Sequence, residues 1–215
     1  MKTYILLLLL LPLGAAAQQR DPGPDYTKAI SFSPLALAQI DFTMMLGAEY
    51  RLRPGFSLYT DAGYIFSSAY LTDGGNSRGA SGFIIRPAAR FYLRGRSLFY
   101  LQPQVFYKQV THRLHDWLGK NCVEGVPAFE QLQDFRYRRQ AYGFNGVVGA
   151  LVPLSRRDRV FFDFYLGLGV RYKKNAVVKE PNCCFDRGGF VTTINRDEGS
   201  FPSIPAGVKL VIAVD

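Results

Sequence analysis

The chain has 215 residues, 48% of which are hydrophobic, and a formal net charge of +9 at pH 7. Beyond its first residues no apolar run approaches the roughly 18 residues that a membrane-spanning helix needs, which argues against a helical membrane protein. The basic balance is compatible with nucleic-acid binding, but an export signal argues against that partner and favours anionic lipid headgroups.

Residues 1–17 have the features of a secretory signal peptide. A basic residue precedes an unbroken apolar run, and Ala15 and Ala17 provide an A-x-A cleavage site. We expect cleavage after Ala17, because the apolar run is too short for a comfortable membrane anchor. A short linker over residues 18–27 and one domain over residues 28–215 should follow.

After the linker, apolar and polar residues alternate with period two, and helical periodicity is scarce. The first predicted strand has the weakest alternation and contains Pro34, which cannot donate to a strand ladder. The eight predicted strands cover, in chain order, residues 28–37, 42–52, 56–66, 83–93, 98–110, 139–154, 160–172 and 204–214.

The links between these strands alternate in length. The sequences RPG, RGRS and SRRDR follow the second, fourth and sixth strands, whereas long links, including residues 113–134 and 173–202, follow the odd-numbered strands from the third onward. Outer-membrane barrels combine short periplasmic turns with long extracellular loops. The pattern therefore predicts an all-β fold, an eight-stranded antiparallel up-and-down transmembrane β-barrel.

The fourth predicted strand, FIIRPAARFYL, shows how the two strand faces differ. Phe83, Ile85 and Phe91 share one face, and Arg86 and Arg90 lie on the other. In a membrane barrel the apolar face contacts lipid and the polar face lines the interior. We expect the interior charges to pair and seal a barrel that is too narrow for an open pore. The charged residues at such positions are Glu49, Arg51, Asp61, Arg86, Arg90, Asp163, Arg171 and Lys209.

Aromatic residues gather near the ends of the predicted strands, on the apolar face. Membrane barrels have aromatic girdles at both interfaces, although aromatic residues also favour strands in general. A secreted soluble barrel with a ligand cavity is the alternative, but it would need an apolar interior and outward charges. The residues of the predicted girdles are Tyr50, Phe56, Tyr64, Phe66, Phe91, Phe99, Tyr107, Tyr142, Phe162 and Tyr172.

Two segments carry a resemblance to a known family. The stretch SPLALAQIDFTMMLGAEYRL leads into the predicted barrel, and RPAARFYL lies on its fourth strand. This layout resembles the small outer-membrane barrel proteins of Bacteroidota-type bacteria, of the DUF3575-like or OmpA/OmpX-like kind, over essentially all of the mature chain. The resemblance implies a barrel fold in the bacterial outer membrane and no catalytic residue.

The chain has only two histidines, His112 and His115, in the sequence THRLHDW, and either could supply a general base. With Asp116 as the orienting carboxylate and a rim serine (Ser67, Ser68 or Ser203) as nucleophile, they could serve a lipid-modifying hydrolase or acyltransferase. No spacing selects one serine, so exposed loop histidines are the favoured interpretation. Metal binding by this pair has weaker support still, and we expect no cofactor.

The three cysteines, Cys122, Cys183 and Cys184, lie in the two longest predicted loops. An exported chain can form disulfides, and the odd number leaves one thiol over. Bonding of Cys122 to either of the other two would join the two loops, and a vicinal bond within the pair is a strained alternative.

The sequence therefore favours a monomeric outer-membrane barrel with a structural or surface-recognition role through its long loops. Its expected partners are outer-membrane lipids, including lipopolysaccharide, and a protein or glycan at the cell surface.

Overall fold

A computed structural model describes residues 24–69, 77–93, 98–123, 126–154, 159–178, 183–184 and 198–214. The predicted signal peptide and the first part of the linker lie outside these residues, and so do the RGRS link and most of SRRDR. The elements are β1 (Lys28–Phe32), η2 (Pro34–Ala38), β2 (Asp41–Arg53), β3 (Phe56–Ser68), β4 (Ser77–Tyr92), β5 (Phe99–Lys120), β6 (Phe129–Pro153), β7 (Val160–Val178), β8 (Cys183–Cys184), β9 (Gly199–Ser203) and β10 (Ala206–Ala213).

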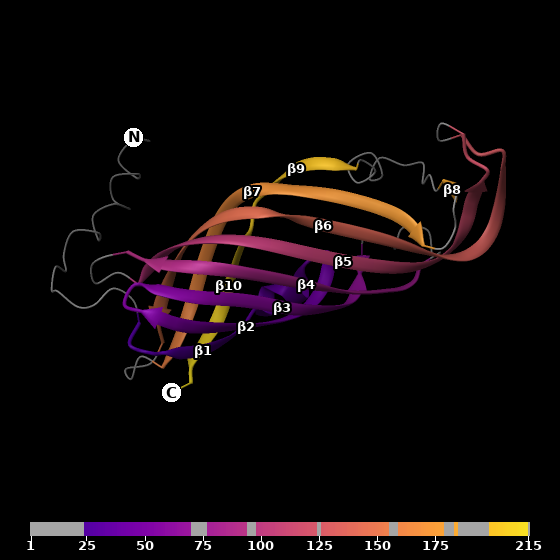
Figure 1. The fold of residues 1–215 in the computed structure, drawn as a ribbon. Coiled ribbons are helices and arrows are strands. Elements are labelled where there is room, and N and C mark those ends of the chain that lie inside the picture. The colour runs from indigo at the N-terminus through magenta and orange to yellow at the C-terminus, as the bar shows by residue number, and fades with distance from the viewer. Residues whose placement is uncertain are drawn as a thin grey trace, which may run out of the picture.

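The prediction of an all-β antiparallel fold is confirmed. Consecutive strands from β1 to β7 pair as neighbours, and β10 pairs with both β1 and β7, so the sheet returns on itself as a ring (Figure 1). β9 continues the last strand along the other half of β7, and β8 adds to the edge of β5. No described helix has the length and apolar character needed to cross a membrane.

The segment predicted as a long polar loop at residues 113–134 is instead an extension of two strands. β5 and β6 stay paired from Phe99↔Ala150 to Lys120↔Phe129, well past the end of the neighbouring strands. Figure 1 shows this hairpin projecting from the ring and curling at its end. The loop prediction was wrong because the outward positions turn polar there, while buried Leu114 still faces inward. β7 likewise continues beyond its predicted end at residue 172.

The first strand is shorter than predicted. β1 ends at Phe32, and the 3₁₀ helix η2 begins at Pro34, which lacks the backbone donor that a continued ladder requires. The β1–β10 ladder ends at the Phe32↔Leu210 pair, and one further bond joins the Ser33 amide to the Met45 carbonyl. Along the described residues, β1 therefore closes the ring only in its half nearer the β2–β3 turn.

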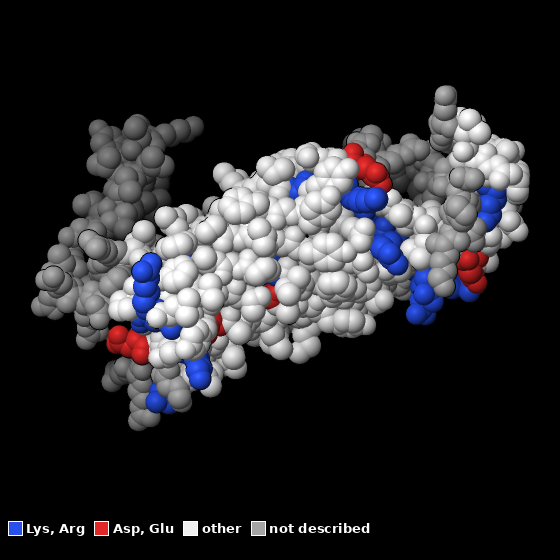
Figure 2. All heavy atoms as spheres, viewed as in Figure 1, with Lys and Arg blue, Asp and Glu red and all other residues white. Residues whose placement is uncertain are grey.

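The two faces of the sheet differ sharply in exposure. Apolar side chains point outward, with Tyr64 61% and Leu168 70% exposed, whereas the inward-facing Arg90 is fully buried. On the face shown in Figure 2, an almost uncharged belt crosses the middle of the molecule, with lysine and arginine at its two ends. The ring is therefore apolar outside, and its buried charged side chains lie inside.

Candidate functional site

Arg90 on β4 is the centre of a buried network inside the ring. Its Nη1 lies 2.9 Å from Oε2 of Glu49, and its Nη2 lies 3.0 Å from Oδ2 of Asp163. Its Nε donates to Oε1 of Gln102 at 2.9 Å, and the guanidinium lies 3.9 Å from the centre of the Tyr100 ring. A buried guanidinium needs acceptors for its fork of donors, and β2, β5 and β7 supply them.

A second ion pair lies nearby. Nζ of Lys209 on β10 is 2.8 Å from Oδ2 of Asp61 and 2.9 Å from the hydroxyl of Tyr59. The Tyr59 hydroxyl also bonds Asp61 and lies 2.8 Å from the hydroxyl of Ser31. Both charged side chains are almost completely buried, so each offsets part of the cost of removing the other from water.

The end of the interior nearest the β2–β3 turn is filled by aromatic and aliphatic side chains. Tyr26, which precedes β1, packs edge-on against Phe161 with ring centroids 5.7 Å apart, and Tyr92 packs against Tyr100. The hydroxyl of Tyr92 also donates to Glu49 at 2.6 Å. Together with the ion pairs, this cluster obstructs the interior.

The eight predicted interior charges are divided between three places. Glu49, Asp61, Arg90, Asp163 and Lys209 form the two ion-pair clusters. Arg51 lies at the rim by the β2–β3 turn, where its Nη1 donates to the Pro24 carbonyl. Arg86 and Arg171 line a cavity in the ring, and Arg86 stands opposite Asp61 in the register of β3 and β4.

Two cavities in the ring share lining residues, and bases outnumber acids among the residues that line them. The larger, of about 460 Å³, is lined by Lys108, Arg139, Arg171 and Lys173, and by one acid, Asp41. The smaller, of about 230 Å³, shares Lys108 and Arg171 and adds Arg86. The Asp41 carboxylate lies 2.6 Å from Nζ of Lys108 and 3.8 Å from Nη2 of Arg139. We call these two cavities the outer cavities.

Sequence reasoning missed four of these lining residues as site candidates. Asp41 lies one residue before the predicted second strand, Arg139 begins the predicted sixth, and Lys173 falls one residue beyond the predicted seventh. Lys108 lies within the predicted fifth strand but is not among the predicted interior charges. Continued alternation was the usable signal, since Arg171 and Lys173 occupy inward positions of one strand.

The predicted histidine pair is not assembled. His112 faces the inside of the β5–β6 hairpin and is fully buried, whereas His115 faces outward and its Nδ1 lies 2.8 Å from Oδ1 of Asp134. Asp116, the predicted orienting residue, instead accepts a bond from the Trp117 amide. Burial, assisted by the Arg139 charge, lowers the pKa of His112 to about 4, so this ring is neutral at neutral pH.

Two of the predicted rim serines have other partners or lie at a cavity. Ser68 donates to Oδ1 of Asp41 at 2.5 Å, and Ser203 lines the smaller outer cavity. Among the described residues, no three side chains of histidine, cysteine, aspartate or glutamate are grouped so that they could hold a metal ion.

Cys122, just beyond the end of β5, is bonded in a disulfide. The other two cysteines of the chain form β8, whose backbone pairs with β5 at Gly119↔Cys184 and Lys120↔Cys183. The backbone thus brings all three cysteines to one end of the hairpin, but the side chains of Cys183 and Cys184 lie outside the described part.

Comparison with known proteins returned no match among family models, curated proteins or solved structures.

Proposed function

We propose that the chain is an eight-stranded β-barrel of the bacterial outer membrane, with a plugged polar interior and a projecting hairpin that serves recognition at the cell surface. The observation that carries this proposal is an inversion of polarity along β5 and β6. Within the ring the apolar side chains of these strands point outward, whereas beyond the ring their buried apolar side chains point inward.

Within the ring, the outward face is apolar, and the inward face holds the buried polar and charged side chains. Leu101, Val105 and Phe144 point outward and are 45–54% exposed, while Gln102 and Gln104 are buried inside. A soluble ring would gain stability from the opposite arrangement, because its outer surface would contact water. Hydrocarbon around the ring explains it directly.

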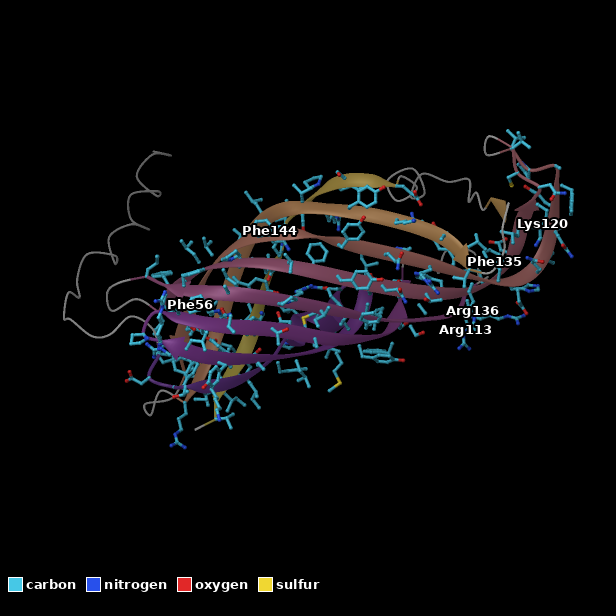
Figure 3. The ribbon with its side chains drawn as sticks, viewed as in Figure 1. Phe56, Arg113, Lys120, Phe135, Arg136 and Phe144 are labelled. Atoms are coloured by element: carbon cyan, nitrogen blue, oxygen red, sulfur yellow. The ribbon has the colours of Figure 1, made fainter. Side chains whose placement is uncertain are left out.

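Beyond the ring, the arrangement is the opposite. Leu118 and Phe135 point inward and are buried, and Arg113 and Arg136 face each other across the strands on the exposed side. Figure 3 shows Phe56 at one end of the ring, Phe144 midway, and Arg113 and Arg136 farther along toward Lys120. This is the pattern of a hairpin in water, so the boundary between lipid and water should lie on the ring side of Arg113 and Arg136.

Aromatic rows mark the same boundary. Tyr107, Tyr142 and Tyr172 lie in register on three neighbouring strands, with 5.4 Å between the ring centroids of Tyr142 and Tyr172. Toward the other end of the ring, Phe56 and Phe91 pair at 5.0 Å. The eight steps along β5 between the Phe99 and Tyr107 levels span about 20 Å of height at about 3.3 Å per residue and about 40° tilt. This height is close to the apolar band of such barrels.

The plugged interior favours an anchoring and presenting role over conduction. Buried ion pairs and the aromatic cluster beneath them obstruct part of the narrow space that an eight-stranded barrel encloses. The projecting hairpin, by contrast, offers Trp117 and Leu132 as an exposed cross-strand pair. Aromatic residues exposed among polar neighbours are typical anchors of recognition surfaces, so we expect a protein or glycan to bind there.

Membrane fractionation combined with gel mobility tests this proposal. The mature chain should fractionate with outer membranes, resist extraction by carbonate, and migrate differently before and after boiling, because a closed barrel stays compact in detergent. Recovery of the folded chain in the aqueous phase after detergent partitioning would contradict the membrane assignment and favour a secreted soluble barrel.

A further inference from the structure

We propose that the outer cavities form one anion-binding vestibule, which takes phosphate groups through Arg86, Lys108, Arg139, Arg171 and Lys173. The inference rests on the proposed function for its orientation, because it places these cavities at the extracellular half of a membrane barrel. Its chemistry rests on the lining alone.

The charge of the lining is strongly unbalanced. Five basic residues line the two cavities, and Asp41 is the one acid among the described lining residues. The Asp41 carboxylate lies 2.6 Å from Lys108 and 3.8 Å from Arg139. Deeper in the ring, Glu49 and Asp163 contact Arg90, and Asp61 contacts Lys209 and stands opposite Arg86 in the strand register. A polyanion in the cavity would offset repulsion between these partly buried cations.

Two polar atoms in the vestibule lack partners. Nε of Arg171 is a buried donor, and Oδ1 of Asn145 is a buried acceptor. Neither atom forms a hydrogen bond with a described residue. Buried polar groups are almost always satisfied, so an orphan donor beside a cavity points to a ligand or bound water. A guanidinium also matches the oxygen geometry of phosphate better than an ammonium does. Arg171 lines both cavities and is therefore the expected central contact.

The vestibule also reaches the side of the ring where β1 no longer pairs with its neighbours. Gln39, just after η2, lines both cavities, and Ser203, Ile204 and Pro205 line the smaller one. These residues flank the place where the β1 ladders have ended, at the interruption between β9 and β10. A phosphate group could therefore arrive on a soluble molecule from the open end, or on a lipid headgroup through this side. The chemistry of recognition is the same for both sources.

Titration of the folded, detergent-solubilised protein tests the proposal, with inorganic pyrophosphate as the soluble probe and short-chain phosphatidic acid as the lipid probe. The test variant is Arg171→Gln/Lys173→Gln, which neutralises two lining residues on β7. The matched control is Arg136→Gln/Lys174→Gln, which removes the same charge from outward, exposed positions at the same end of the molecule. Heat-dependent gel mobility is measured on every sample, so that loss of the barrel is distinguished from loss of binding.

We expect at least one probe to bind, and the test variant to weaken its binding by about tenfold or more while the control changes it little. Tighter binding of pyrophosphate identifies a soluble ligand, and tighter binding of phosphatidic acid identifies a lipid headgroup. Equal losses in the two variants would overturn the proposal, because they would indicate a diffuse surface potential. Absence of binding by a heat-modifiable barrel would also overturn it, and would leave the proposed function standing.

Discussion

Arg90 on β4 and Asp163 on β7 meet across the interior of the ring, with Nη2 of the arginine 3.0 Å from Oδ2 of the aspartate. Their strands are not neighbours, and 73 positions separate the residues in the chain. The same guanidinium contacts Glu49 on β2. One side chain therefore joins three strands of the ring, and its removal should affect the whole fold.

Replacing Arg90 with alanine should destabilise the protein by about 3–5 kcal/mol, because two buried carboxylates lose their shared cation. Urea unfolding in lipid vesicles measures this free energy. Arg53→Ala provides the control, since Arg53 is exposed and contacts Phe56 at the end of the ring. If the two substitutions cost the same, the network contributes nothing specific to stability.

Gly47→Ala should also destabilise the fold, by about 1–3 kcal/mol. A Cβ atom at Gly47 would collide with the side chains of Ser31, Tyr59 and Asp61, which hold Lys209. At Gly146, by contrast, an added Cβ meets nothing closer than 3.9 Å. Gly146→Ala should therefore leave the unfolding free energy nearly unchanged, and a larger loss there than at Gly47 would contradict the described packing.

His112 should make stability depend on pH. Its pKa is about 4 in the folded protein and near 6.5 when unfolded, so the unfolded chain binds more protons between those values. Stability should therefore fall as the pH falls, by about 2 kcal/mol between about pH 7 and about pH 5. His112→Gln should remove this part of the pH dependence. An identical pH profile for the variant would show that the ring is not buried in neutral form.

Non-reducing peptide mapping should find a peptide containing Cys122 joined by a disulfide to the peptide that contains Cys183 and Cys184. One thiol should remain to react with an alkylating reagent. The pairing of β8 with β5 is the reason, because it brings the backbone of the two segments together. Three reactive thiols in the exported protein would refute the cross-link.

The ring could be predicted from the sequence because its alternation is strong and its links are distinctive. In β2, inward polar residues such as Thr43 and Glu49 stand between outward apolar ones. That pattern also separated the buried charges from the exposed aromatics. Which charges pair could not be read from it, because Arg90 and Asp163 lie on strands that are far apart in the sequence.

The projecting hairpin and the vestibule could not be predicted in the same way. Beyond the ring, the outward face of β5 becomes polar at Arg113. The alternation of outward apolar and inward polar residues that marks the other strands is lost there, and the sequence resembles that of a loop. Pro34 correctly marked weakness in the first strand, but alternation alone cannot show that a 3₁₀ helix replaces its second half. Arg139 and Lys173 then became lining residues only once the longer strands were known.

The most direct test of the account compares the same substitution at two outward positions. Leu168 lies in the apolar belt of the ring, and Leu132 lies on the projecting hairpin, and both are exposed. If hydrocarbon surrounds the ring, Leu168→Arg should destabilise the protein folded in vesicles by about 2–4 kcal/mol. Leu132→Arg should change its stability by less than about 1 kcal/mol. Equal and small effects at both positions would mean that water contacts the belt, and would contradict the account.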